Sequence, residues 1–363
     1  MNFDQNTLTT VLAVLKVLEA NAAAALRVSD RYEFGATTRA ISNRSWEAER
    51  IIKILNDKEK EAFRAVMLSM LLMTAGNTAT VRNPNLYDGS SAMPISTLMN
   101  NYTKYIWKLV GGQSPKKYIP TKKDYATAKK LLPVVSSIPS DRKKVLQTIK
   151  DKNFLGDPKK TASEEDIKIA DVLYRGLHSM SNQSLMYLFF TKNPSWDITR
   201  AVSTSEDKQI SIDFMQGKNG QVGEGWRLLF TINNDDGRGF DAGNLSFYAN
   251  EDEYFLSGIL NIDAIGFKMS VVDVKTGNAE YIDIYRSSSS DLNVKFLGKK
   301  YRGKEASNIF LSIMQDKESR TNNEYDDFGN ILGRKTSVFR IGNKKYTYNK
   351  KGTIYVNASV KTN

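Results

Sequence analysis

The sequence predicts an α+β protein in which a helical amino-terminal region precedes mixed α/β and β-rich parts. Three observations support this class. Leucine and alanine recur at helical spacing between residues 8 and 26. From about residue 185 onward, short apolar runs are separated by Gly, Asn and Asp turns, as strands are. Breaks rich in Gly, Pro and Ser predict a division into residues 1–112, 113–286 and 291–363.

Composition limits the chemistry that the chain can perform. It has 363 residues, of which 40% are hydrophobic and 25% charged, enough for two or three domains with apolar cores. The chain has no cysteine and a single histidine, His178. Disulfides, thiol catalysis, Cys- or His-based metal sites and a Ser-His-Asp triad are therefore excluded, and no metal is expected. Catalysis would depend on carboxylates, arginine, lysine and hydroxyl groups.

The charge balance is strongly basic and uneven. The formal net charge is +12, and residues 291–363 alone hold 15 Lys and Arg against 7 Asp and Glu. Such an excess favours an acidic partner, for example nucleic acid or an anionic surface. No apolar run is long enough to span a membrane, and no secretory signal is visible at the amino terminus.

The first region reads as helices without catalytic motifs. A helix is expected over residues 8–26. Asn56 and Glu59 have the spacing of a capping box, which predicts a helix through Met73 that stops at Gly76. A third helix is expected over residues 94–110. The stripe around Met67 and Leu71 is typical of a core.

The second region reads as a linker, short helices and then strands. Residues 113–123 hold two prolines and four lysines and are read as the linker. Helices are expected over residues 124–132, 140–150 and 163–171, and a short strand at 172–174 would deliver Arg175. A turn is expected at residues 275–278. Further strands are expected at residues 185–191, 209–215, 226–232, 245–248, 254–261, 267–274 and 280–285.

Three short motifs lie in order along this region. They are Tyr174-Arg175-Gly176, Ser203-Thr204-Ser205, and the glutamate pair Glu251 and Glu253 at the entrance of an apolar run. Residues i and i+2 of a strand share a face, so Ser203 and Ser205 would point together, as would the two glutamates. A planar guanidinium such as that of Arg175 suits diphosphate oxygens.

Each motif is weak by itself, but their order and spacing resemble the mono-ADP-ribosyltransferases of the Arg–Ser–Glu class. This class includes actin-modifying binary toxins and several phage enzymes. The resemblance covers about residues 124–286. It implies a core of two packed antiparallel-rich sheets, NAD as the substrate, and transfer of ADP-ribose to a protein.

The resemblance also implies a role for each motif residue. Arg175 would contact the phosphates of NAD, and Ser203 would hold Glu253 in place. Glu253 would hydrogen-bond the ribose and stabilise the positive charge that develops as nicotinamide leaves. Glu251 would address the acceptor, and glutamate at that position goes with arginine as the acceptor residue. Thr204 and Ser205 complete the predicted NAD-binding set, with Thr204 pointing away from Ser203.

Residues 235–243 precede the glutamates, where the resembled family carries a mobile substrate-recognition turn. Arg238 in this loop is expected to be solvated, and Phe240 and Tyr248 to pack in the core. His178 is expected at the surface. The family's aromatic residue before the Ser-Thr-Ser motif has no clear counterpart, since Trp196 lies seven positions upstream.

The predicted function is an NAD-dependent, arginine-directed protein mono-ADP-ribosyltransferase. The alternative is a non-enzymatic basic structural or nucleic-acid-binding protein, such as a virion component. That alternative depends on residues 340–355, where lysines and tyrosines interleave. The two combine if this tail anchors the enzyme to a nucleic-acid-associated target or a virion, while the amino-terminal helices dock a carrier. The setting stays open between host cytoplasm, non-classical export and an intracellular effector.

Overall fold

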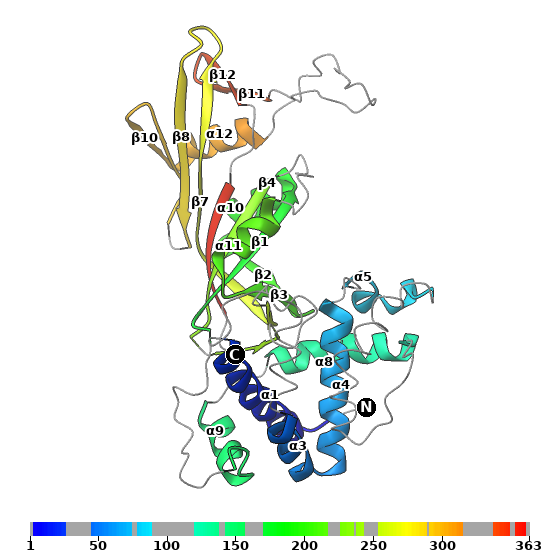
Figure 1. Ribbon diagram of the computed structural model, residues 1–363. Coiled ribbons are helices and arrows are strands. Elements are labelled where there is room, and N and C mark those ends of the chain that lie inside the picture. The colour runs from blue at the N-terminus through cyan, green and yellow to red at the C-terminus, as the bar shows by residue number, and fades with distance from the viewer. Residues whose placement is uncertain are drawn as a thin grey trace.

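The computed structural model shows an elongated molecule with helices at one end and a large sheet that extends to the other (Figure 1). The start of α1 and the end of β13 both lie toward the helical end. The described residues are 3–26, 45–74, 78–88, 120–137, 142–156, 170–216, 226–235, 237–242, 253–288, 290–314, 337–348 and 353–360.

The helical end has a core of its own. Apolar side chains of α1, α3, α4, α8 and α9 form one buried cluster, into which Phe255 of the sheet also packs. The helices are α1 Gln5–Leu26, α3 Ser45–Ile54, α4 Asp57–Thr74, α5 Thr78–Arg82, α8 Lys122–Ser137 and α9 Arg142–Asp151, with a 3-10 turn at Pro84–Leu86. The predictions for residues 8–26 and 56–73 are confirmed. The helix predicted at 94–110 lies outside the described residues.

The predicted capping box at the start of α4 is present. The Asn56 N–H donates to Glu59 Oε2 at 3.0 Å, and the Glu59 N–H donates to Asn56 Oδ1 at 2.9 Å. Two of the amide groups that a helix start leaves without partners are thereby satisfied. Lys152 Nζ reaches Glu59 Oε1 at 2.6 Å, which joins α4 to the turn after α9.

All described strands are hydrogen-bonded into one mixed sheet, whose main path runs β10-β9-β8-β7-β13-β4-β1-β3-β6-β5. The two packed sheets implied by the resemblance are therefore joined. The cause is the length of β7, which pairs along its 15 residues with β2, β13, β8 and β12. The strands are β1 Val172–Met180, β2 Ser195–Asp197, β3 Val202–Ser205, β4 Trp226–Asn233, β5 Phe240–Asp241, β6 Glu253–Leu256, β7 Ile259–Asp273, β8 Ala279–Ser287, β9 Asn293–Phe296, β10 Lys299–Arg302, β11 Ser337–Ile341, β12 Lys344–Tyr348 and β13 Thr353–Val360.

The last strand of the chain lies in the middle of this sheet. β13 is parallel to β4 on one side and antiparallel to β7 on the other. Its alternate residues Ile354, Val356 and Ala358 are buried in the same core as β4 and β7. The sheet thus crosses the boundary predicted at residues 286–291, and the three-part division stays a prediction.

Two segments predicted as strands, residues 185–191 and 209–215, are helices instead. They form α10 Asn182–Phe190 and α11 Lys208–Gln216. Ser181 caps α10 by accepting from the Ser184 N–H, and the buried residues Leu185, Leu188 and Phe189 follow helical spacing. In α11 the buried residues Ser211 and Met215 are four apart. Short apolar runs fit both periods, and here the caps decide.

The remaining strand predictions are largely confirmed. The turn at residues 275–278 joins β7 to β8. The run predicted at 254–261 is divided between β6 and β7 at Gly258, whose φ of 145° favours glycine. The strand predicted at 245–248 lies outside the described residues. In the third region α12 Gly303–Met314 was not predicted, and it packs its apolar side on the sheet. None of the helices in the described ranges could cross a membrane.

Candidate active site

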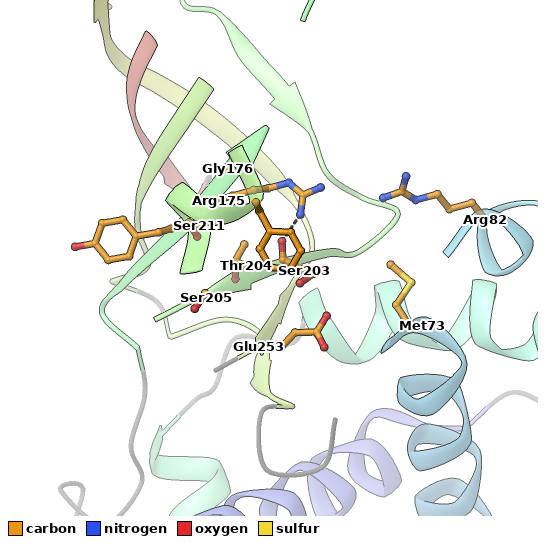
Figure 2. Close-up of a pocket in the computed structure, with 11 residues that line it drawn as sticks. Met73, Arg82, Arg175, Gly176, Ser203, Thr204, Ser205, Ser211 and Glu253 are labelled. Carbon is orange, nitrogen blue, oxygen red and sulfur yellow. Dashed lines mark hydrogen bonds between the residues drawn. The ribbon is translucent and has the colours of Figure 1, made fainter. Parts of the chain in front are cut away.

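A cavity of about 210 Å³ lies where the sheet meets the helical end (Figure 2). Strands β1, β3 and β6, with helix α11, form one side of it, and α4 and α5 contribute the other. Its lining residues are Met73, Arg82, Tyr174, Arg175, Gly176, Ser203, Thr204, Ser205, Ser211, Phe214 and Glu253.

The strand register brings the three sequence motifs together. Tyr174 of β1 is paired with Ser205 of β3, and Ser205 is paired with Glu253 of β6. Arg175, the Ser-Thr-Ser triplet and Glu253 therefore lie on adjacent strands and line one cavity, although about eighty positions separate them in the chain. Strand order, which sequence spacing alone does not give, places them there.

Arg175 is a cation fixed in the cavity wall. Its side chain is half-buried, and its guanidinium donates a hydrogen bond to the carbonyl oxygen of Ser203. Burial, together with the nearby charge of Arg82, lowers the pKa of Arg175 to about 10, while Glu253 opposes the change. At neutral pH the group stays charged. Its Nε, buried, has no hydrogen-bond partner among the described residues, so one donor is unused.

Gly176 allows a helix to lie against β1. A Cβ at this position would be 1.8 Å from the carbonyl oxygen of Ser211 and 2.9 Å from Met215 Cβ. Only glycine permits such an approach of α11. That approach brings Ser211 and Phe214 to the cavity. The glycine of the Tyr-Arg-Gly motif thus has a packing role.

The hydroxyl groups of β3 have different partners. Thr204 Oγ1 donates to the carbonyl oxygen of Tyr254 at 2.8 Å, which ties β3 to β6. Ser205 Oγ accepts from the Asp207 N–H at 3.0 Å. Ser203 is paired with Phe255, which lies two residues from Glu253 on β6. Ser203 and Glu253 are therefore diagonal neighbours on the same face of the sheet. The role predicted for Ser203 in holding Glu253 stays a prediction.

Glu253 is a buried carboxylate, 6% exposed, at the first position of β6. Figure 2 shows its carboxylate pointing into the cavity, between the side chains of Ser203 and Met73. A buried carboxylate is costly unless positive charge or donors compensate it, and Arg175 lies on the same cavity. Glu251 lies outside the described residues, as does Tyr248.

Two lining residues come from the region in which the sequence showed no chemistry. Met73 is near the end of α4, and Arg82 ends α5. The guanidinium groups of Arg82 and Arg175 face each other across the cavity (Figure 2). No motif marks Arg82 in the sequence, because only the packing of α5 against the sheet brings it here.

Other residues singled out in the sequence lie elsewhere. Arg238 was expected to be solvated, and this is wrong. Its side chain is 6% exposed, and its backbone is held by Asn234, which accepts from the Arg238 N–H and donates to the Arg238 carbonyl at 3.0 Å. His178 is exposed, as predicted. Trp196 packs on Phe230 with ring centroids 4.6 Å apart and does not line the cavity.

Metal-ligating side chains are scattered in the part of the chain that the structure describes. In those ranges no three His, Cys, Asp or Glu side chains are grouped so as to hold a metal ion. The polar groups of the cavity are two guanidinium groups, one carboxylate and several hydroxyls. Guanidinium and hydroxyl groups donate to phosphate and sugar oxygens, whereas metal ions need several anionic or neutral lone-pair donors.

Comparison with known proteins gives no close relative. No family model and no curated protein matches the sequence. The ADP-ribosyltransferase HopU1 of Pseudomonas syringae pathovar tomato aligns with 72% of this chain and 93% of its own, at 14% identity and a TM-score of 0.30. Exoenzyme S of Pseudomonas aeruginosa, solved with human 14-3-3 protein beta and carba-NAD, aligns with 59% of this chain and 84% of its own, at 14% identity and a TM-score of 0.20. TM-scores this low do not establish a shared fold.

Proposed function

We propose that this chain is an NAD-dependent mono-ADP-ribosyltransferase that modifies arginine in a target protein. One observation supports this most. Arg175, Ser203 and Glu253, to which the resemblance assigns phosphate binding, positioning and catalysis, line one cavity on three adjacent strands. If the three short motifs matched the family by chance, there would be no reason for these three side chains to meet in one cavity.

The charges of the cavity suit the two ends of NAD. Arg175 and Arg82 offer two guanidinium groups to the diphosphate. Glu253 offers a carboxylate to the nicotinamide riboside, which carries positive charge. A cavity of about 210 Å³ is smaller than the ~300–1,000 Å³ of typical ligand pockets. It would therefore hold part of the dinucleotide.

NAD supplies the ADP-ribosyl group, since its bond from ribose carbon to nicotinamide nitrogen breaks and the electron pair leaves with nicotinamide. The Glu253 carboxylate stabilises the positive charge that grows on the ribose, as carboxylates do in glycoside hydrolysis. Ser203 positions that carboxylate. Arg175 holds the diphosphate, so that the ribose stays against Glu253. Burial of Glu253 strengthens its electrostatic effect.

The acceptor is an arginine of another protein. A carboxylate from Glu251 aligns the incoming guanidinium through two hydrogen bonds and takes the proton that the attacking nitrogen loses. The new bond joins that nitrogen to the ribose carbon. Glutamate, rather than glutamine, at this position supports arginine over asparagine, following the resemblance of the motif.

The proposal is tested by incubating the protein with NAD labelled in the adenylate phosphate and with bacterial or eukaryotic lysates. Label on protein that survives boiling is expected, together with free nicotinamide. Glu253→Gln should lower transfer about a hundredfold or more, because it removes the stabilising charge and keeps the shape. Glu280→Gln, on β8 outside the cavity lining, is the matched control and should keep full activity.

The acceptor residue is tested separately with agmatine, a small guanidine, in place of a protein. Glu251→Gln should abolish transfer to agmatine and retain the slow release of nicotinamide to water. If neither transfer nor nicotinamide release occurs with any lysate or with agmatine, the proposed function is wrong.

A further inference from the structure

The far end of the sheet has one covered face and one open face. Phe267, Ile282, Val294 and Phe296 point to the covered face, where they pack with α12 in the core. Their neighbours along each strand point to the opposite face, because side chains alternate in a strand. We call this the open face, and it consists of Lys268, Tyr281, Asp283, Tyr285, Lys295, Lys300, Arg302 and Tyr355.

The strand register arranges the open face in rows. Lys268 of β7, Asp283 of β8, Lys295 of β9 and Lys300 of β10 are paired in sequence across four strands. A second row runs from Tyr355 of β13 through Gly266 and Tyr285 to Asn293 and Arg302. Tyr281 lies two residues from Asp283 on β8, beyond the first row. Three tyrosines are thus interleaved with four cations, and Asp283 is the acidic residue among them.

The tyrosine rings of the open face are exposed to solvent. Tyr281 is 63% exposed, Tyr355 56% and Tyr285 37%. The Lys268 ammonium lies 4.7 Å from the ring centroid of Tyr281, and that of Lys300 lies 5.7 Å from the centroid of Tyr285. Each of these two rings therefore has a cation beside it. Exposed rings that gather with cations on one face of a sheet are typical of a binding surface for single strands.

The tyrosines of the carboxy-terminal hairpin behave differently. Tyr346 and Tyr348 are 2% and 3% exposed, and Tyr346 packs edge-on against Phe296. The rings of Tyr346 and Tyr348 are therefore not available for bases to stack on. The exposed rings lie instead on β8, where Tyr281 and Tyr285 each have a lysine beside them, and on β13, where Tyr355 is exposed.

We infer that the open face binds single-stranded nucleic acid. Exposed rings on a sheet let unpaired bases stack, and lysine and arginine beside them neutralise the phosphates. Tyr281 and Tyr285 are four residues apart, or about 13 Å along the strand. Tyr355 lies two strands from Tyr285, or about 10 Å, with Gly266 between them. These separations leave room for one base on each ring, with Lys268 and Lys300 beside two of the rings to neutralise the backbone.

A single strand fits the open face better than a duplex or an acidic protein. The bases of a duplex are stacked on one another and offer no free faces to the tyrosines. An acidic protein surface would pair with the four cations but has no row of unpaired bases to stack on the three separated rings. The open face also lies at the end of the molecule away from α4 and α5, so it does not depend on the NAD cavity (Figure 1).

The test uses the full-length protein and fluorescein-labelled twelve-nucleotide probes of oligo-U RNA and oligo-dT DNA. Fluorescence anisotropy should show binding of at least one probe, and a duplex DNA of the same length should bind at least tenfold more weakly. The affinity should fall with salt at a log–log slope of about −2 to −3, because four cations contribute about −0.7 each on a single strand.

Variants separate stacking from charge. The double change Tyr281→Ala with Tyr285→Ala should weaken binding about tenfold or more, whereas Tyr281→Phe with Tyr285→Phe should retain it, since phenylalanine also stacks. The control is Tyr187→Ala on α10, where the ring is 50% exposed on another surface, and it should change nothing. Both changes on the open face affect exposed side chains, so the melting temperature should hold.

Three results would overturn the inference. The first is equal affinity for duplex and single-stranded probes. The second is no loss of affinity in the double alanine variant. The third is competition by poly-glutamate as effective as that by unlabelled RNA, which would show a surface for acidic proteins. Loss of protein ADP-ribosylation in Glu253→Gln bears on the NAD cavity alone and leaves this inference untouched.

Discussion

The guanidinium of Arg175 donates a hydrogen bond to the carbonyl oxygen of Ser203, which joins strand β1 to β3 across the cavity wall. The ladder between these two strands has a single register pair, Tyr174 with Ser205. The side-chain bond therefore supports a short ladder, and it aims the rest of the guanidinium at the cavity. One residue thus fixes the strand that carries the Ser-Thr-Ser motif and supplies charge for a ligand.

Arg175→Lys is expected to damage both roles while keeping the charge. An ammonium is a point donor and does not span Ser203 and a phosphate together as a planar guanidinium does. The KM for NAD should rise about tenfold to a hundredfold, from the loss of one charge-assisted bond. Arg200→Lys, at an exposed arginine outside the cavity lining, should leave the KM as it is. Equal KM values for the two variants would contradict the assignment.

The facing pair Arg82 and Arg175 predicts how ligand binding depends on pH. The pKa of Arg175 is about 10, so this group loses its charge as the pH rises through that value, and affinity for ADP-ribose should fall there. In Arg82→Gln the neighbouring positive charge is gone, so the pKa of Arg175 should be higher. Calorimetric titration between pH 8 and 11 should show weaker binding in Arg82→Gln and a fall that is shifted to higher pH.

The stability of the empty protein should follow the opposite trend. The pKa of Arg175 is below its ordinary value. Above about pH 10 the unfolded chain therefore binds more protons at this residue, and the contribution of Arg175 to stability rises with pH. Ligand binding falls in the same interval. A parallel fall of binding in wild type and in Arg82→Gln, with the same midpoint, would show that the two guanidinium groups are not coupled.

Sequence reasoning succeeded where the information is local. The capping box of Asn56 and Glu59 depends on a spacing of three residues, and it is present in the structure. The turn at residues 275–278 and the strands around it are equally local signals. The residues Arg175, Ser203 and Glu253 were found because each belongs to a short motif, although their meeting in one cavity required the strand order.

Sequence reasoning failed where a helix cap was overlooked and where tertiary packing decides. The runs at residues 185–191 and 209–215 are apolar at both strand and helix spacing, and the caps at Ser181 and Asp207 favour helices. Arg82 lies in a five-residue helix without a motif, and only the packing of that helix brings it to the cavity. The burial of Tyr346 depends on Phe296, which is far away in the sequence.

Gly176→Ala should be far more harmful than an ordinary glycine substitution. The added Cβ would lie 1.8 Å from the carbonyl oxygen of Ser211, so α11 must move away from β1 and take Phe214 out of the cavity wall. We expect a fall in melting temperature of several degrees and a fall in transfer of about tenfold or more. At Gly277, with φ of 72°, nothing lies within 4 Å of an added Cβ, and alanine there should cost only about 1 kcal/mol. Similar losses for both variants would argue against the close approach of α11.

The capping box at the start of α4 gives a prediction about stability alone. Glu59 is 6% exposed, accepts from the Asn56 N–H and pairs with Lys152. Glu59→Ala should therefore lower the free energy of unfolding by about 2 kcal/mol or more. It removes the acceptor of the Asn56 N–H and leaves the Lys152 ammonium half-buried without its carboxylate. Asn56→Ala removes the other half of the box and should cost about 1 kcal/mol. Chemical denaturation measures both values.

The control for this series is Glu61→Ala, an exposed glutamate on the same helix, which should change the free energy of unfolding by less than about 0.5 kcal/mol. The order of the three losses is the decisive result, since helix propensity favours alanine at residues 59 and 61 and would predict a gain at both. A loss at Glu59 no larger than that at Glu61 would mean that the capping bonds and the Lys152 pair add nothing to stability. Met73, at the other end of α4, lines the cavity. A loss at Glu59 and Asn56 but not at Glu61 would therefore show that the first turn of α4 stabilises the helix that forms this wall of the cavity.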